Sequence, residues 1–347
     1  MGNAMPYIIN YQYGTRTATY NESRIIHNGF LPLSRIKKTI VHTMIHLILG
    51  GGLGNQMFQY AFARSLALQY NENISFNTIL YKELKNEERS FSLGHLNINT
   101  MCIMETPDEN KRIWELFNKQ IFHQKIARKI LPASFRWWWM SNRNIYANVC
   151  GPYKYYHPRY RSKNTTIIHG GFQSWKYFKE HQSMIKAELK VITPISKPNK
   201  KILKEIQNSN SICVHIRRGD FLSAQFSPHL EVCNKDYYEK AIKMISSKIE
   251  NPTFFIFSNT HEDLVWIRKN YNIPQNSVYV DLNNPDYEEL RLMYNCKHFI
   301  LSNSSFSWWA QYLSESKNKI IIAPKIWDKR KGIDFSDIYM PEWIIIK

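Results

Sequence analysis

The chain has 347 residues, of which 44% are hydrophobic and 14% aromatic, so it can bury one large core or two smaller ones and is not expected to be disordered. No run of about 18 consecutive apolar residues occurs, so no membrane-spanning helix is expected. The formal net charge of +18 favours a partner that is nucleic acid, anionic lipid or an anionic substrate.

The first half opens with a polar, irregular segment, residues 1–43, which we expect to be a poorly ordered extension. Met44 then begins an apolar strand that runs to residue 49. The glycine-rich loop Gly50–Gln56 follows and leads into a helix whose apolar residues recur at helical spacing. Such a loop lets the backbone approach a ligand and offers the free amides of a helix N-terminus. A tight turn without a ligand is the alternative, because neither the dinucleotide nor the P-loop pattern is present.

The next part of the chain, residues 71–190, is less regular. A short strand is expected at Ile74–Phe76, and a second one near Ile167 should end in a glycine turn before a helix from about Trp175. Between them lie aromatic and basic runs, 136–139 and 153–160. Such runs can stack against sugars, but they more often pack a loop-rich domain.

The most informative stretch is Ser211–Phe221, which reads SICVHIRRGDF. Residues 211–216 are short, apolar and β-branched, as expected of a buried strand. The strand ends in Arg217, Arg218, Gly219 and Asp220. Because the arginine side chain presents a planar fork of donors that suits phosphate, the stretch favours a phosphate-bearing ligand at the end of a central strand. An exposed arginine pair or a surface Arg-Gly-Asp tripeptide is the alternative.

Strands and helices then alternate five times. One helix is expected from about Asn234, and another after a cap at Thr260, with Asp263 in the capping-box position. Two further helices are expected at 285–295 and 306–313. Strands are expected at 253–257, 277–280, 298–301 and 319–322. This alternation predicts a parallel, doubly wound sheet. Polar clusters follow its strands at 217–220, 258–259, 281 and 303–305, and the carboxyl ends of parallel strands share the edge where ligands bind.

Four stretches together resemble one family, the bacterial α-1,2-fucosyltransferases of glycosyltransferase family eleven. They are GGLGNQMFQYAF at Gly51–Phe62, GFQS at Gly171–Ser174, HIRRGDF at His215–Phe221 and CKHFILSNSSFSWW at Cys296–Trp309. The resemblance runs from Met44 to near the C-terminus. It implies an α/β, GT-B-like fold, in which two Rossmann-type domains with mainly parallel sheets face each other. We therefore expect an acceptor-side domain at 44–195 and a GDP-fucose-binding domain at 196–347.

The resemblance also implies a reaction, the transfer of L-fucose from GDP-β-L-fucose to the 2-hydroxyl of a terminal galactoside, with inversion, in a surface glycan. It implies no cofactor and no metal, and the sequence offers no Asp-x-Asp pair placed as a metal site. The five cysteines form no C-x-x-C pair, so they are expected to be free thiols in a reducing cytoplasm, without a zinc site.

By the same resemblance, Arg217 contacts the β-phosphate and stabilises the leaving GDP, which replaces the usual metal. His215 helps to fix the diphosphate or the ribose, and Arg218 belongs to the same motif. Phosphate oxygens would be cradled by Asn303, Ser304, Ser305 and Ser307. From the opposite domain, the loop with Gly52, Gly54, Asn55 and Gln56 would close on the donor or the acceptor.

The chain departs from the family pattern where acids are expected. Asn259 and Thr260 stand at the two positions after Phe257-Ser258 where relatives carry acids, so an acid that reads guanine or ribose would be Glu289 or Asp281. The catalytic base, which inversion by direct displacement needs, could be Asp220, Glu231 or Asp236. Asp220 is nearest to the arginines, and orienting them is its more common role.

Several alternatives stay open. Trp308 and Trp309 could stack on guanine, although core packing is commoner for such a pair. Nucleic-acid binding is disfavoured, because Lys and Arg are spread along the chain and no known module appears. Another GDP-sugar would satisfy the phosphate argument equally well. The positive charge could also hold the protein peripherally on the anionic inner face of the cytoplasmic membrane.

Overall fold

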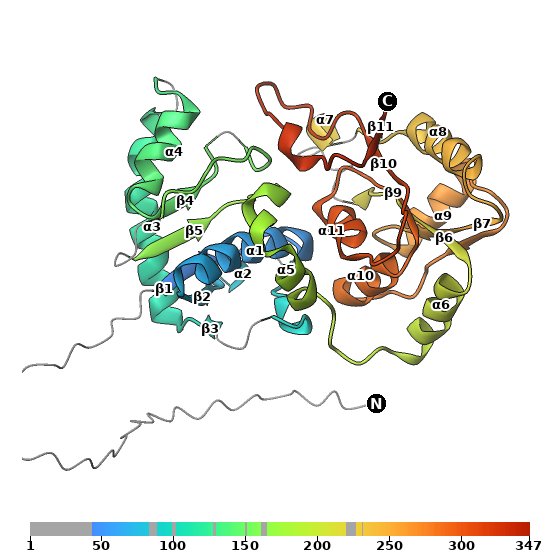
Figure 1. Ribbon diagram of the computed structural model, residues 1–347, viewed down its shortest axis with the longest axis horizontal. Coiled ribbons are helices and arrows are strands. Elements are labelled where there is room, and N and C mark those ends of the chain that lie inside the picture. The colour runs from blue at the N-terminus through green and yellow to red at the C-terminus, as the bar shows by residue number, and fades with distance from the viewer. Residues whose placement is uncertain are drawn as a thin grey trace, which may run out of the picture. The chain divides into compact units, whose positions relative to one another are not determined.

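The computed structural model describes residues 44–82, 89–98, 102–127, 130–149, 151–160, 165–219, 227–230 and 232–347, which belong to one compact unit. The expected extension, 1–43, lies outside the described residues. In the described part of the chain, two parallel sheets are each flanked by helices (Figure 1). This confirms the α/β fold class with two mainly parallel sheets.

The first sheet has the strand order β3-β2-β1-β5-β4 among the described residues. Its strands are β1 (Met44–Ile48), β2 (Asn73–Asn77), β3 (Ile103–Met104), β4 (Ile145–Ala147) and β5 (Thr166–His169), and every pairing is parallel. Helices α1 (Leu53–Tyr70), α2 (Ile79–Lys82), α3 (Pro107–Ala127) and α4 (Ala133–Ser141) connect them, with a 3₁₀ turn at Leu93–His95. The predicted strands at Met44 and Ile74 are confirmed, whereas the sequence patterns did not reveal α3, α4 and β4.

The second sheet has the order β11-β10-β9-β6-β7-β8, again with parallel pairings. Its strands are β6 (Asn210–His215), β7 (Pro252–Phe257), β8 (Ser277–Tyr279), β9 (His298–Ile300), β10 (Ile321–Pro324) and β11 (Ile344–Ile346). The helices are α6 (Lys197–Gln207), α7 (Ser227–Leu230), α8 (Lys235–Ser246), α9 (His261–Asn270), α10 (Asp286–Tyr294) and α11 (Ser305–Leu313). The predicted alternation is confirmed to within two residues at most ends, and α6 and β11 extend it.

Polar caps start the helices where the sequence indicated. Asn234 Oδ1 accepts a hydrogen bond from the backbone N–H of Tyr237 at 3.0 Å, and Thr260 Oγ1 accepts one from Asp263 at 3.2 Å. In a capping box, the carboxylate of Asp263 would accept a hydrogen bond from the backbone N–H of Thr260, but here it binds other partners. It accepts hydrogen bonds from Arg218 and Gly219, which belong to the segment after β6.

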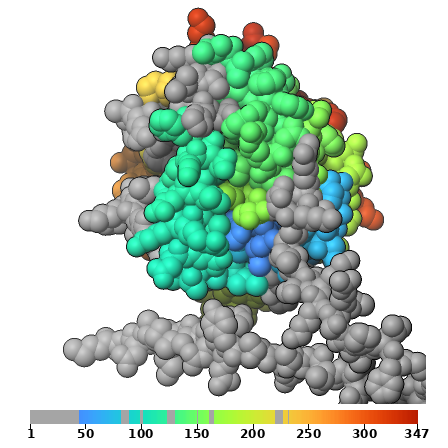
Figure 2. All heavy atoms as spheres, turned by 90° about the vertical axis from the view of Figure 1, so that its left-hand side faces the viewer, coloured from blue at the N-terminus to red at the C-terminus, as the bar shows by residue number. Residues whose placement is uncertain are grey.

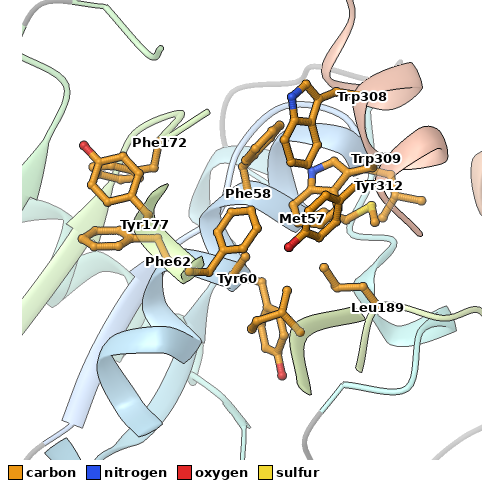
Figure 3. Packing of buried hydrophobic residues seen from close by; sticks show 14 of the residues in the cluster. Met57, Phe58, Tyr60, Phe62, Phe172, Tyr177, Leu189, Trp308, Trp309 and Tyr312 are labelled. Carbon is orange, nitrogen blue, oxygen red and sulfur yellow. The ribbon is translucent and has the colours of Figure 1, made fainter. Parts of the chain in front are cut away.

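One hydrophobic cluster includes residues from both sheets. Between β5 and α6, a 3₁₀ segment, Trp175–His181, packs beside α1, and α5 (Gln182–Glu188) is joined to α1 by hydrogen bonds from Tyr60 and Arg64 to Glu188. Figure 3 shows Phe58 of α1 beside Trp308 and Trp309 of α11, with ring centroids 4.7 and 4.9 Å apart. Both tryptophans are fully buried, which supports their interpretation as core residues rather than guanine platforms.

The boundary between 195 and 196 separates the strands of the two sheets in sequence. Because the hydrophobic cluster and the α1–α11 contact cross it, the division into two domains stays a prediction. No helix of the described residues is long and apolar enough to cross a membrane. The cysteines that the structure describes, at positions 102, 213, 233 and 296, are free thiols, as predicted for them.

Candidate active site

The N-termini of α1 and α11 meet at the junction of the two sheets (Figure 1). A Cβ added to Gly54 would lie only 2.6 Å from the backbone nitrogen of Phe306. The indole N–H of Trp309 donates to the carbonyl oxygen of Gly54 at 3.0 Å. Two helix N-termini this close put unpaired amides and the positive ends of two helix dipoles side by side, which favours an anion.

Asn55 joins three of the motifs that the sequence singled out. Its side-chain oxygen accepts a hydrogen bond from the Ser305 hydroxyl at 2.9 Å and another from the Gln173 amide at 3.0 Å. The glycine loop, the GFQS stretch and the start of α11 therefore converge on one residue, although more than 100 positions separate each from the next. Such convergence is expected of a site rather than of three unrelated turns.

The glycine loop is held by side chains of its own half. Gln56, fully buried, donates to the carbonyl oxygens of Gly51 and Ser90 and accepts from the backbone N–H of Ser92. Gly51 has φ +77°, a left-handed conformation that favours glycine. Gln56 thus fixes the loop from behind, and its predicted contact with substrate remains untested.

The strand β6 delivers His215 and Arg217 to the same region. His215 is almost fully buried, and its Nδ1 lies 2.9 Å from the Ser302 hydroxyl. Burial, together with the positive charge of Arg217, lowers the pKa of His215 to about 3, so the imidazole is neutral at physiological pH. A neutral His215 can orient a neighbour or a ligand by hydrogen bonding but adds no positive charge to the site.

The two adjacent arginines have different surroundings. The Arg218 guanidinium lies 3.4 Å from the ring centroid of Trp266 and donates from Nε to Asp263 at 3.2 Å. Its backbone N–H donates to Asn259 Oδ1 at 3.2 Å. Arg218 therefore anchors the loop after β6 onto α9, and its predicted contact with the donor stays a prediction.

These contacts give structural roles to Asn259 and Thr260, at the two positions where the resemblance led us to expect acids. Asn259 holds the backbone of the arginine loop, and Thr260 caps α9, so both positions serve the fold without a negative charge. A Cβ at Gly219, where φ is +31°, would lie 2.7 Å from Cγ of Asn259. Asn259 and Gly219 are thus packed against each other.

The polar residues at the start of α11 mostly bind one another. Ser304 caps the helix by accepting from the Phe306 N–H at 3.2 Å, and the Ser307 hydroxyl donates to the carbonyl oxygens of Ser302 and Ser304. The side-chain amide of Asn303 donates to the carbonyl oxygens of Leu230 and Trp327. Any cradle for phosphate here would therefore depend chiefly on backbone amides and on Ser305. The predicted roles of Asn303, Ser304 and Ser307 toward phosphate are untested.

Between the two carboxylates proposed for nucleoside contacts, the structure favours Glu289. Burial raises the pKa of Glu289 to about 8, against the opposing effect of nearby Arg217. Asp281, in contrast, lies on the surface, where it pairs with His261 at 2.5 Å. Glu289 is electrostatically coupled to Arg217, the residue proposed to contact the diphosphate.

Arg89 was missed by sequence reasoning, because no motif surrounds it. A Cβ at Gly52 would lie 3.2 Å from its Nη1, so its side chain covers the glycine loop. Its positive charge also opposes the burial that raises the pKa of Asp286, a residue of α10 that accepts from the Ser92 hydroxyl at 2.9 Å. Arg89 thereby adds a positive charge from the first half of the chain near the junction of α1 and α11.

The candidates for the catalytic base remain open. Asp220 and Glu231 lie outside the described residues, and Asp236 is exposed in the first turn of α8. Among the residues with described positions, no group of three or more His, Cys, Asp or Glu side chains is arranged to hold a metal ion.

In open parallel α/β sheets, nucleotide-containing ligands bind at the carboxyl ends of the strands, where this anion-favouring junction lies. The model of glycosyl transferase family 11 matches residues 44–347, so the chain belongs to this family and is a glycosyltransferase.

Full-length relatives come from Escherichia coli. The chain is 29% identical to the alpha-1,2-colitosyltransferase, over 86% of this chain and 97% of the relative. It is 27% identical to the O-antigen biosynthesis glycosyltransferase WbnK, over 85% of this chain and 98% of the relative. A shorter match, 27% identical over 40% of each chain, is to the galactoside alpha-(1,2)-fucosyltransferase 2 of Rattus norvegicus. Among solved structures, the NodZ alpha-1,6-fucosyltransferase co-crystallized with GDP has a TM-score of 0.48, 14% identity and coverage of 78% of this chain and 92% of that one.

Proposed function

We propose that this glycosyltransferase transfers L-fucose from GDP-β-L-fucose to the 2-hydroxyl of a terminal galactoside, with inversion and without a metal ion. The proposal depends on one junction, where the two helix N-termini meet at Gly54 and Phe306. The His215 ring lies 6.0 Å from the Phe306 ring, and Arg217 is electrostatically coupled to both His215 and Glu289. The names of two relatives support the α-1,2 linkage, and the name of a third supports a role in O-antigen synthesis. We accordingly propose a surface glycan as the acceptor and the cytoplasmic face of the membrane as the place of action.

In the proposed reaction, the galactoside O2 attacks the anomeric carbon of fucose while the bond from that carbon to the β-phosphate oxygen breaks. The departing GDP gains negative charge, which Arg217 and the free amides at the starts of α1 and α11 stabilise. Arg89 adds positive charge from the other half of the chain. The proton of the acceptor hydroxyl passes to a carboxylate, for which Asp220 and Glu231 remain the candidates beside the exposed Asp236.

A second donor has support of its own. The name of a full-length relative specifies colitose, and colitose could be carried by the same nucleotide. The groups that would hold the diphosphate do not distinguish the two sugars, so GDP-colitose is the alternative donor.

The decisive experiment incubates the purified protein with lactose, EDTA and either GDP-fucose or GDP-colitose. We expect 2′-fucosyllactose with an α-anomeric proton signal. Product from GDP-colitose alone would make colitose the donor. If neither donor reacts, a GDP titration separates a wrong acceptor, for which GDP still binds, from a wrong reaction class, for which it does not. Product lost on chelation and restored by Mg²⁺ would refute metal independence.

The raised pKa of Glu289 predicts a pH dependence of donor binding. Guanine offers N–H donors, so a carboxylate binds it better than a neutral carboxyl group does. With a pKa of about 8, most Glu289 is protonated at pH 7, and binding must displace the proton. The affinity for GDP-fucose should therefore rise roughly severalfold for each pH unit between pH 6 and 8.

Calorimetric titrations without acceptor would measure this effect and the accompanying proton release. GDP-fucose is preferred to GDP because it lacks a terminal phosphate that titrates in the same range. Glu289→Gln should bind more weakly and lose the pH dependence. A wild-type affinity that is constant between pH 6 and 8 would show that Glu289 does not contact the base.

A further inference from the structure

Acidic residues are absent from a long stretch in the first half of the chain. The 64 residues from 116 to 179 contain twelve Lys and Arg but no Asp or Glu. They contribute +12 to the net charge of +18, although Lys and Arg themselves are spread along the chain. No acid within the stretch offsets these charges, although Lys154 and Lys176 pair with Asp334 and Asp337 of the second half.

Four large apolar side chains of this stretch are exposed around the start of α4. We call them the apolar ridge; they are Ile130, Leu131, Phe135 and Trp138, with exposed fractions of 76%, 38%, 45% and 41%. Figure 2 shows that the teal and green part of the chain, to which α3 and α4 belong, forms much of one face of the molecule.

The ridge is supported by a well-anchored helix. Phe135 and Trp138 are three residues apart on α4, and their ring centroids are 5.5 Å apart. On the opposite side of the helix, Trp137 and Met140 are buried in the core, and the buried Arg136 donates to the carbonyl oxygen of Val149. The exposed aromatic pair is therefore held outward by a helix that cannot easily turn it inward.

Along the sequence, the exposed cations Lys119 and Arg143 lie on either side of the ridge, and the acids of α3 lie before Lys119, the last of them one turn earlier. The exposed Arg143 lies 3.8 Å from the ring centroid of Trp139, and Lys119 is exposed on the second half of α3. Asp108, Glu109 and Glu115 are confined to the first half of this 21-residue helix, which spans about 30 Å at 1.5 Å per residue. The second half of α3 and α4 therefore combine apolar anchors with positive charge.

We propose that the apolar ridge and its flanking cations dock on an anionic lipid bilayer. Aromatic side chains prefer the interface between headgroups and acyl chains, and Lys and Arg are attracted to anionic headgroups. Ile130 and Leu131 distinguish this partner from nucleic acid, because aliphatic side chains offer no stacking face to a base but do enter an acyl layer. Docking places the first sheet next to the bilayer, where a lipid-linked acceptor would arrive.

The test is co-sedimentation of the purified full-length chain with vesicles, in the absence of donor and acceptor. One set contains phosphatidylglycerol in phosphatidylethanolamine, and the other contains only phosphatidylcholine. We expect binding to the anionic vesicles that weakens in high salt. The variant Phe135→Ser/Trp138→Ser should lower the partition coefficient by at least about tenfold, because it removes both aromatic anchors.

The matched control is Ile192→Ser/Ile345→Ser, which removes two exposed apolar side chains outside the acid-free stretch. It should bind vesicles like the wild type, and both variants should keep the wild-type unfolding midpoint. Equal losses in the two variants, or equal binding to neutral vesicles, would overturn the proposal. So would a preference for single-stranded RNA over vesicles, or a lipid-free dimer that the ridge variant abolishes. None of these outcomes bears on the reaction, which is assayed separately with lactose.

Discussion

Replacing Arg217 with alanine is expected to lower kcat on the order of a thousandfold, while the folded state persists. The guanidinium would stabilise charge that develops on the leaving diphosphate, and removing one such donor typically costs a factor of about 10² to 10³. Because the reaction is proposed to proceed without a metal ion, no divalent cation would compensate for the lost guanidinium. Rates of 2′-fucosyllactose formation at saturating donor would measure the effect.

Two further variants make this result specific. Arg217→Lys keeps the charge but loses the planar fork of donors, so it should recover only part of the rate. Arg268→Ala removes an exposed arginine of α9 that lies over the Tyr279 ring, and it should leave the rate unchanged. If Arg217→Ala retained more than about a tenth of the wild-type kcat, stabilisation of the leaving group would have to be assigned to other residues.

Replacing Gly54 with alanine is expected to impair stability and activity together. The added methyl group would lie 2.6 Å from the Phe306 backbone nitrogen and 2.8 Å from the Ser305 carbonyl carbon. Both neighbours are backbone atoms, so α1 and α11 must separate. Overpacking of this kind costs about 1–3 kcal/mol. The displacement should also lower kcat/KM by at least about tenfold, because it shifts the amides that we propose face the diphosphate.

Gly94 provides the matched control. A methyl group there would lie 3.5 Å from the Phe91 ring, an ordinary contact, so Gly94→Ala should change the free energy of unfolding by less than about 0.5 kcal/mol. Urea unfolding and steady-state kinetics on both variants would compare the two positions. Full stability and activity in Gly54→Ala would mean that the helix N-termini are further apart in solution.

The second half of the chain could be predicted from its sequence because its local signals agree. Short β-branched strands, polar caps such as Asn234 and Thr260, and helical spacing all indicated the same elements. In the first half, α3 and α4 carry aromatic and basic residues on several faces, so no single period stood out. The strands β4 and β11, with three residues each, are too short for alternation to identify.

The parts of the candidate site that lie in sequence motifs could be predicted, whereas residues that tertiary packing brings to it could not. The glycine loop, the arginine strand and the Asn-Ser-Ser segment were identified, and the structure brings the first and last of them into contact through Asn55 and Ser305. The position of Arg89 over Gly52 depends on tertiary packing, for which the sequence has no local signal. For the same reason, the different surroundings of Arg217 and Arg218 could not be distinguished from the sequence.

The contact between α1 and α11 limits how this enzyme can be re-engineered. Exchanging residues 196–347 with those of a relative, to change the donor sugar, would bring in a foreign α11 against the native Gly54 and Asn55. The indole hydrogen bond to Gly54 and the Ser305–Asn55 pair would then join residues that were selected in different proteins. Chimaeras that also carry the relative's α1 should therefore outperform those that exchange the second half alone.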